Sequence, residues 1–255
     1  MTEFTILIPT KNRPNNIPKI ISEVRSHVQP DSRIGFLFSD ASEKRFEGEM
    51  GFDNVGYIWS NANLPNSRQW LIENCPTDLF IMMDDDLKIE GNLEGLFTPL
   101  LSDSKILISG AALKLPRYFS KEPWVEDRYV ITCWAGIKSR LISSGVKYDP
   151  RFVVLEDIEV CFQAWVNGFK VVYVPSVMVQ QSSNLKKVTG GNPYRGTNWK
   201  DTRIHYLNLV SQYFLEKYPK LHIDNHNRIH ITIDQLKEQG MTTKQPTLSS
   251  IFTHT

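Results

Sequence analysis

The stretch Leu79-Phe80-Ile81-Met82-Met83-Asp84-Asp85-Asp86 sets three consecutive aspartates directly after a run of apolar residues. A short apolar run bounded by polar residues predicts a buried β-strand, so the carboxylates are expected together at its C-terminal end. In an α/β sheet, ligands bind at that end of the strands. Three like charges this close repel one another unless solvent screens them or a hard divalent cation binds them. The stretch therefore has two interpretations, a polar surface loop or a site for Mg2+ or Mn2+.

The composition predicts a globular α/β protein. With 255 residues, of which 41% are hydrophobic, the chain can bury a large core within one domain. The formal net charge of +1 excludes a global attraction to nucleic acid but leaves room for a local basic patch. Cys75, Cys133 and Cys161 are widely spaced and lack metal-ligand spacing, which fits reduced thiols. No segment approaches the ~18 apolar residues of a membrane span, and the N-terminus does not resemble a secretory signal, so we expect a cytoplasmic protein.

Apolar runs alternate with helical patterns along the chain, and this alternation predicts right-handed crossovers and a mostly parallel sheet. Strands are predicted at Phe4–Pro9, Gly35–Phe38, Asn54–Trp59, the run before the aspartates, Lys105–Leu113, Tyr129–Trp134 and Lys170–Val174, which Pro175 closes. Helices are predicted after Pro14 and at Ser67–Glu73, Glu156–Asn167 and Thr202–Tyr218. The polar segment Gln180–Trp199 predicts a mobile loop, and the residues after Gly240 predict an extended tail.

Three motifs in a fixed order resemble a known group of enzymes. Thr5-Ile6-Leu7-Ile8-Pro9-Thr10-Lys11-Asn12-Arg13 resembles the opening of the GT-A glycosyltransferases, especially the large inverting family 2 type. The triple aspartate then stands where that fold carries its Asp-x-Asp metal motif, and Leu155-Glu156-Asp157 stands where it carries a Glu-Asp pair. The resemblance implies an α/β, Rossmann-like GT-A fold with a mixed, mostly parallel sheet flanked by helices. It implies one domain over residues 1–240, with a nucleotide-sugar-binding half (1–103) and an acceptor-binding half (104–240), and a tail (241–255).

The resemblance also implies how a nucleotide-sugar donor, with a UDP-sugar as the first candidate, is bound. A divalent cation, Mn2+ or Mg2+, would stabilise the diphosphate leaving group, with Asp86 as its direct ligand and Asp84 near the metal or the ribose. Asp85 would either support these ligands or replace one of them. The segment from Thr10 to Arg13 also fits a plain loop that leads into a helix. The residues expected to bind the donor are Pro9, Thr10, Asn12, Arg13, Asp40, Arg68, Asp84 and Asp85.

An inverting transfer needs a base that takes the proton from the acceptor hydroxyl. The resemblance assigns this role to Asp157, with Glu156 as the second choice. Both residues stand at a predicted helix N-terminus, where the helix dipole favours carboxylates. Their alternative role is therefore to stabilise that helix.

One region departs from the family pattern. Many members of this fold carry a histidine, a further metal or phosphate ligand, just after the strand that corresponds to Val171–Pro175. Here Gln180 and Gln181 occupy the region. An amide oxygen is a weak ligand, so metal binding would depend more heavily on the aspartates.

The acceptor is predicted from a cluster of basic and aromatic residues. This cluster either closes over the donor diphosphate, holds a nucleic-acid backbone, or is a solvated basic loop. In its compact length and its lack of a membrane segment, the chain resembles, more loosely, the phage-type and TET-associated glycosyltransferases that modify hydroxymethylated pyrimidines in DNA. A phage-encoded protein of this type would be expected in the host cytoplasm. A target base in duplex DNA would be flipped out to reach Asp157. The residues expected to contact phosphate or the acceptor are Lys186, Lys187, Arg195 and Trp134, with Lys114, Arg117 and Lys121 as further candidates.

Three other functions stay open. A polysaccharide-building glycosyltransferase would share the core and differ in its acceptor. A nucleotidyltransferase would also use clustered aspartates, but Pro9–Pro14 lacks the glycines of its signature. An inactive nucleotide-sugar-binding or DNA-binding module is the third. The identity of the sugar, the nucleotide of the donor and the oligomeric state do not follow from the sequence.

Overall fold

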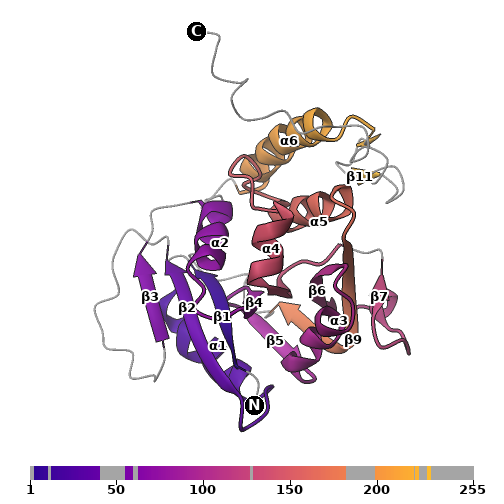
Figure 1. The fold of residues 1–255 in the computed structure, drawn as a ribbon. Coiled ribbons are helices and arrows are strands. Elements are labelled where there is room, and N and C mark those ends of the chain that lie inside the picture. Colours follow the sequence, from indigo (N-terminus) through magenta and orange to yellow (C-terminus); the bar gives the residue numbers. More distant parts are fainter. Residues whose placement is uncertain are drawn as a thin grey trace.

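The structure is a computed structural model that describes residues 3–10, 13–40, 55–59, 63–126, 129–181, 199–220, 222–223 and 229–230. One mixed sheet organises these residues, with the strand order β3-β2-β1-β4-β8-β6-β9-β5 and β7 beside β9 (Figure 1). A small separate ribbon pairs β10 (His222–Ile223) with β11 (Ile229–His230).

The first half of the sheet is parallel, as the alternation of strands and helices predicts. It contains β1 (Glu3–Thr10), β2 (Arg33–Asp40), β3 (Val55–Trp59) and β4 (Leu79–Met83). The strand β1 is buried from Phe4 to Thr10, because it pairs with β2 on one edge and with β4 on the other while helices cover both faces. Parallel pairing brings the C-terminal ends of these strands to one edge of the sheet.

The second half of the sheet is mixed. The strand β8 (Cys133–Ile137) runs antiparallel to both β4 and β6 (Ile106–Leu113). The long strand β9 (Lys170–Gln181) is parallel to β6, whereas β5 (Leu87–Glu90) and β7 (Val125–Glu126) run antiparallel to β9. The predicted α/β fold with a mixed, mostly parallel sheet is confirmed.

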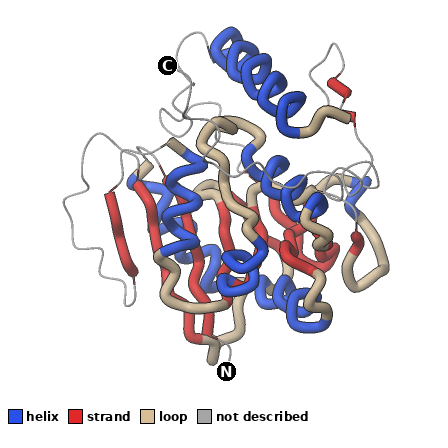
Figure 2. The backbone as a smooth tube through the Cα atoms, turned by 45° about the horizontal axis from the view of Figure 1, so that its top comes forward, coloured by secondary structure: helices blue, strands red, loops and turns tan. Residues whose placement is uncertain are grey.

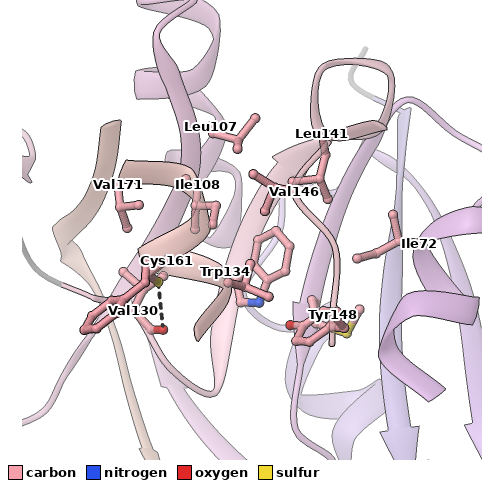
Figure 3. Packing of buried hydrophobic residues seen from close by; sticks show 14 of the residues in the cluster. Ile72, Leu107, Ile108, Val130, Trp134, Leu141, Val146, Tyr148, Cys161 and Val171 are labelled. Carbon is pink, nitrogen blue, oxygen red and sulfur yellow. Dashed lines mark hydrogen bonds between the residues drawn. The ribbon is translucent and has the colours of Figure 1, made fainter. Parts of the chain in front are cut away.

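Helices cover both faces of the sheet and form two cores (Figures 1 and 2). On one face, α1 (Ile17–Arg25) and α3 (Phe97–Ser102) pack against strand residues such as Ile6 and Ile8. On the other face, α2 (Leu64–Glu73), α4 (Lys138–Ser144), α5 (Glu156–Val166) and α6 (Trp199–Lys217) bury a cluster around Trp134 (Figure 3). Short 3-10 turns η1 (Pro14–Asn16), η2 (Leu93–Leu96) and η3 (Pro116–Tyr118) complete the elements.

The strand predicted at Tyr129–Trp134 is displaced: β8 begins only at Cys133. The reason is the backbone of Thr132, whose φ of 66° lies in the left-handed region and cannot continue a strand. The segment before it is therefore a loop that delivers Thr132 to the end of β4.

The strand predicted to close at Pro175 also differs, because β9 continues to Gln181. Its pairing with β6 shifts between Ala111, opposite Val174, and Ala112, opposite Met178. The residues from Pro175 to Val177 therefore bulge out of the ladder, and a bulge accommodates proline because it needs no backbone N–H there. The strand then resumes and runs to the edge that carries the aspartates.

The helix α6 is fastened to α5 by a buried polar cluster. Glu159, fully buried on α5, accepts a hydrogen bond from the Tyr218 hydroxyl at 2.9 Å and pairs with Lys217 at 2.7 Å. Phe214 of α6 packs edge-on against Phe162 of α5. Among the described residues, no helix combines the length and apolar character that crossing a membrane requires.

Candidate active site

The candidate site lies where β1 and β4 end on the same edge of the sheet. Leu7 pairs with Met82, so the end of β1 at Thr10 and the turn Asp84–Asp86 lie side by side. Asp40 ends β2 opposite Thr10, which puts its backbone at the same edge. Thr10 of the opening motif and Asp85 of the triple aspartate, 75 positions apart in the sequence, therefore meet at this edge.

Arg13 and Thr10 hold two of the three aspartates. The Thr10 hydroxyl donates to Oδ2 of Asp85 at 2.6 Å, and Nη1 of Arg13 lies 2.7 Å from Oδ1 of Asp85 and 2.9 Å from Oδ2 of Asp86. Burial lowers the pKa of Arg13, but the charges of Asp85 and Asp86 outweigh it and raise the pKa overall. Asp85 is 5% exposed, so its role in this structure is to tie the end of β1 to the end of β4.

A second arginine, Arg68, joins the aspartate turn to the start of α5. Its Nη2 lies 2.8 Å from Oδ1 of Asp84 and 3.5 Å from Oε1 of Glu156, and its Nη1 pairs with Oδ1 of Asp157. The Arg68 side chain is only 3% exposed. A buried charge is tolerated where partners compensate it, and these three carboxylates supply that compensation. Their charges raise the pKa of Arg68 well above its ordinary value despite the opposing effect of burial.

The local sequence explains how α2 presents Arg68. Asn63 caps the helix by accepting a hydrogen bond from the N–H of Asn66 at 3.0 Å, and Pro65 occupies the first turn, where its missing N–H costs nothing. The helix then buries Ser67, Arg68, Leu71 and Ile72 on one face. A guanidinium on the buried face of a helix reaches the sheet edge because the neighbouring apolar residues seat the helix on the sheet.

Asp157 receives different partners on its two oxygens. Oδ1 accepts from Arg68 and, at 3.2 Å, from the hydroxyl of Tyr148. Oδ2 accepts only a long bond of 3.4 Å from the N–H of Thr132 among the described residues. The side chain is 11% exposed. Oδ2 is therefore the oxygen with capacity for a further partner.

Glu156 and Asp84 have pKa values far above their ordinary range. Burial raises the pKa of Glu156 to about 8, the charge of Asp157 adds to this, and Arg68 opposes it. Burial likewise raises the pKa of Asp84 to about 7, again against Arg68. Glu156 is therefore mostly protonated at neutral pH, which makes it a poorer base than the sequence alone suggests. Such clustered shifts are common at functional sites.

In this arrangement the acids face arginines and do not converge on a shared metal ion. Among the described residues, no group of three or more potential ligands converges on a point that could hold a metal. Asp84 turns to Arg68, and Asp85 and Asp86 turn to Arg13. A cation on Asp86 and Asp84 would require both carboxylates to leave their arginines, so no step below is routed through a metal.

The remaining predicted residues divide into three groups. Pro9 is buried at the end of β1. Trp134 is 2% exposed and packs edge-on against Phe80 in the core, so its indole does not face an acceptor (Figure 3). The residues that lie outside the described part of the chain are Asn12, Lys186, Lys187 and Arg195, together with the side chain of Asp40.

The structure adds two residues to the site that the sequence does not single out. Tyr148 lies in the loop before α5, 9 positions ahead of Asp157, and Thr132 precedes β8. Neither belongs to a motif, and no spacing rule connects them to the acids. Gln181 is placed near the site by β-sheet register, opposite Leu87, which directly follows Asp86.

Comparison of the sequence with models of protein families and with curated proteins gives no match. Comparison of the structure with solved structures does. The chain is similar to GalNAc-T7 solved with UDP, GalNAc and Mn2+ (TM-score 0.60, 11% identity), covering 85% of this chain and 50% of that one. It is also similar to Staphylococcus aureus TarS, covering 84% of this chain and 40% of TarS (TM-score 0.55, 10% identity).

A shorter TarS fragment, residues 1–349 in complex with UDP, gives a TM-score of 0.58 at 12% identity and covers 94% of this chain and 71% of the fragment. The chain thus spans half of GalNAc-T7 and less of full TarS. At identities this low, the similarity supports a shared fold. The predicted GT-A fold, shared with these glycosyltransferases, is confirmed.

Proposed function

We propose that this protein is a glycosyltransferase that moves a sugar from a nucleotide-sugar donor to an acceptor hydroxyl. The observation that carries the proposal is the meeting of Asp84, at the end of β4, and Asp157, at the start of α5, on the buried guanidinium of Arg68. This meeting lies at the sheet edge where α/β folds bind ligands. Support also comes from the GT-A fold, because two neighbours with that fold were solved with UDP.

In the proposed reaction, the acceptor oxygen forms a bond to the anomeric carbon while the bond from that carbon to the diphosphate oxygen breaks. The leaving nucleoside diphosphate takes the electron pair of the broken bond. The proton of the acceptor hydroxyl passes to Oδ2 of Asp157, because Oδ1 is already engaged by Arg68 and Tyr148. Attack from the face opposite the leaving group inverts the anomeric configuration.

The proposal includes a divalent cation, because the site carries an excess of negative charge. The site gathers Asp84, Asp85, Asp86, Glu156 and Asp157 around Arg13 and Arg68. Even with Glu156 protonated, the four aspartates outnumber the two guanidiniums by two formal charges. An anionic diphosphate would be repelled by this excess. Mn2+ or Mg2+, which prefer carboxylate oxygens, would reverse the repulsion once the carboxylates rearrange. A UDP-sugar is the proposed donor, in keeping with the neighbours.

The proposed acceptor is a hydroxymethylated pyrimidine in DNA, with a growing glycan as the alternative. Support for DNA comes from the basic and aromatic composition of residues 186–203 and from Lys114, Arg117 and Lys121 in the loop after β6. All three side chains are exposed, and Lys114 forms an ion pair with Glu90.

The test is to incubate the protein with Mn2+, a panel of nucleotide sugars, and hydroxymethylated DNA, unmodified DNA or oligosaccharides, and to measure mass gain by mass spectrometry. Asp157→Asn should lower transfer by about 10²–10⁴-fold and leave UDP affinity within about twofold, because the base acts on the acceptor proton. The matched control is Asp78→Asn, an exposed aspartate at the opposite end of β4, which should transfer normally. Equal turnover of Asp157→Asn and wild type would remove Asp157 as the base, and transfer to glycans alone would remove the DNA acceptor.

A further inference from the structure

Two residues near Asp157 have a backbone conformation that their side chains disfavour. Thr132 has φ 66° and Leu155 has φ 61°, and within the described ranges these are the non-glycine residues with positive φ. At Gly91, Gly145 and Gly168 the chain meets the same requirement with glycine, which adopts it without strain. A positive φ at a β-branched residue such as Thr132 is an outlier. Such strain persists where the surrounding structure imposes it, often at functional sites.

The backbone of Thr132 lies at the centre of a tight turn. The N–H of Cys133 donates to the carbonyl of Ile131 at 2.7 Å, which closes a γ-turn around Thr132. The γ-turn form with positive φ is rare and strained. The Thr132 hydroxyl is buried and makes no hydrogen bond among the described residues, so side-chain bonding does not explain the conformation.

This turn connects the two parts of the candidate site. The carbonyl of Thr132 accepts a hydrogen bond from the N–H of Asp84 at 2.9 Å, and the N–H of Thr132 points to Oδ2 of Asp157 at 3.4 Å. The register of β8 fixes its position, because Cys133 pairs with Met83, the last residue of β4. A residue in ordinary extended conformation would present its N–H and C=O to the same edge of the strand, whereas the C=O of Thr132 reaches Asp84 and its N–H reaches Asp157.

We infer that Thr132 is a positioning residue for Asp157, and that its strained γ-turn exists to aim the backbone N–H at the Oδ2 oxygen. This inference rests on the proposed function, in which Oδ2 takes the acceptor proton. The backbone N–H holds the carboxylate plane from the side opposite Arg68 and Tyr148. Both carboxylate oxygens of Asp157 are thus held by hydrogen bonds. Because Thr132 also bonds to the N–H of Asp84, it sets the distance between Asp157 and the end of β4.

The direct test replaces the amide N–H of Thr132 by an ester oxygen, through incorporation of the α-hydroxy analogue of threonine. Turnover should fall about tenfold while the KM for the donor stays within twofold, because the donor does not depend on how the base is oriented. Thr132→Val is the matched comparison: it keeps the backbone N–H and the shape but removes the hydroxyl, so its turnover should fall clearly less than that of the ester variant. A loss in Thr132→Val as large as in the ester variant would assign the role to the hydroxyl and overturn the inference.

The strain is tested separately by comparing Thr132→Gly with Thr132→Ala. Both remove the side chain, but only glycine accepts a positive φ freely, so Thr132→Gly should unfold at a temperature several degrees above Thr132→Ala. Equal unfolding temperatures would show that the turn is not strained at this residue and would overturn the inference.

A thermodynamic cycle separates failure of this inference from failure of the proposed function. The ester variant and Asp157→Ala are made singly and together, and unfolding by urea is measured without any substrate. The unfolding constants should show a coupling of about threefold or more between the two changes, whatever reaction the protein catalyses. Absence of coupling would overturn the role of Thr132, whereas coupling in a protein that transfers no sugar would overturn only the glycosyl transfer.

Discussion

The guanidinium of Arg68 pairs with the carboxylate of Asp157, although the two residues are 89 positions apart in the sequence. The pair is almost fully enclosed, with side-chain exposures of 3% and 11%. Through its second nitrogen, Arg68 also holds Asp84 at 2.8 Å. One buried cation therefore fixes the distance between the acid at the end of β4 and the proposed base on α5.

Removal of this cation should destabilise the fold. Arg68→Met leaves Asp84, Glu156 and Asp157 without their shared positive charge, and breaking such a buried network costs about 3–5 kcal/mol. Urea unfolding at pH 7 measures the loss, and the loss should shrink at pH 5 because Asp84 and Glu156, whose pKa values are raised to about 7 and about 8, are then protonated. Arg151→Met is the control, since Arg151 forms a half-exposed pair with Asp149 and its loss should cost about 0–1 kcal/mol. An Arg68→Met variant as stable as the control would contradict the network.

Glu156 should make stability depend on pH. Its folded pKa of about 8 lies above its ordinary value of 4.5, so between these values the folded state binds more protons than the unfolded state. Its contribution to stability is therefore present at low pH and is lost as the pH rises towards 8, by at most about 1.4 kcal/mol per pH unit. Glu156→Gln should gain stability relative to wild type across this window. Unfolding by urea at pH 5, 6.5 and 8 in EDTA measures it, and exposed Glu122→Gln should show no such gain.

The hydroxyl of Tyr148 should help to hold the carboxylate of Asp157 in position. Tyr148→Phe removes the 3.2 Å bond to Oδ1 of Asp157 but keeps the ring under Arg68, so we expect about 1 kcal/mol of lost stability. Turnover should fall several-fold at constant donor KM. The reason is that the phenol holds the carboxylate of Asp157 in place and does not contact the donor.

The control for this variant is Tyr218→Phe, which removes a buried hydroxyl bonded to Glu159 at 2.9 Å on the far side of α5. It should cost similar stability and leave turnover unchanged. If both variants lower turnover equally, the effect of Tyr148 is a general loosening of α5.

Arg13 should compete with divalent cations. Its guanidinium holds Asp85 and Asp86, so Arg13→Gln removes a positive charge that a metal must displace. A unit charge at about 4 Å contributes on the order of 4 kcal/mol at an effective dielectric of 20. We therefore expect Mn2+ to bind Arg13→Gln at least about tenfold more tightly than wild type, as measured by electron paramagnetic resonance. Weaker binding would show that Arg13 helps to form the metal site.

The same titration on Asp86→Asn should weaken Mn2+ binding, because the predicted direct ligand is lost. Lys88→Gln, an exposed cation on β5 close in sequence but outside the cluster, is the matched control and should bind Mn2+ as wild type does. Unchanged affinity in Asp86→Asn would remove Asp86 as a ligand.

Local sequence was sufficient to predict the strands and helices whose apolar residues follow a regular pattern. The run Leu79–Met83 is a buried strand, and Glu156 begins a helix, because burial of apolar side chains dictates both. The resemblance implied that Thr10, Arg13 and the aspartates bind one donor, and the parallel strands β1 and β4 place them at one edge of the sheet. These features depend on neighbours in the sequence and on the general rules of α/β sheets.

Tertiary structure alone decided which groups neutralise the acids. Arg68 is assigned to Asp84 and Asp157 by the packing of α2, and Tyr148 and Thr132 reach Asp157 from loops that no pattern marks. The position of Thr132 depends on the register of β8 against β4 and on a left-handed turn. Because of this turn, β8 begins at Cys133, four residues after the predicted start at Tyr129. Charge pairing across the chain depends on distances that only the packed sheet defines, because electrostatic and hydrogen-bond energies fall off within a few ångströms.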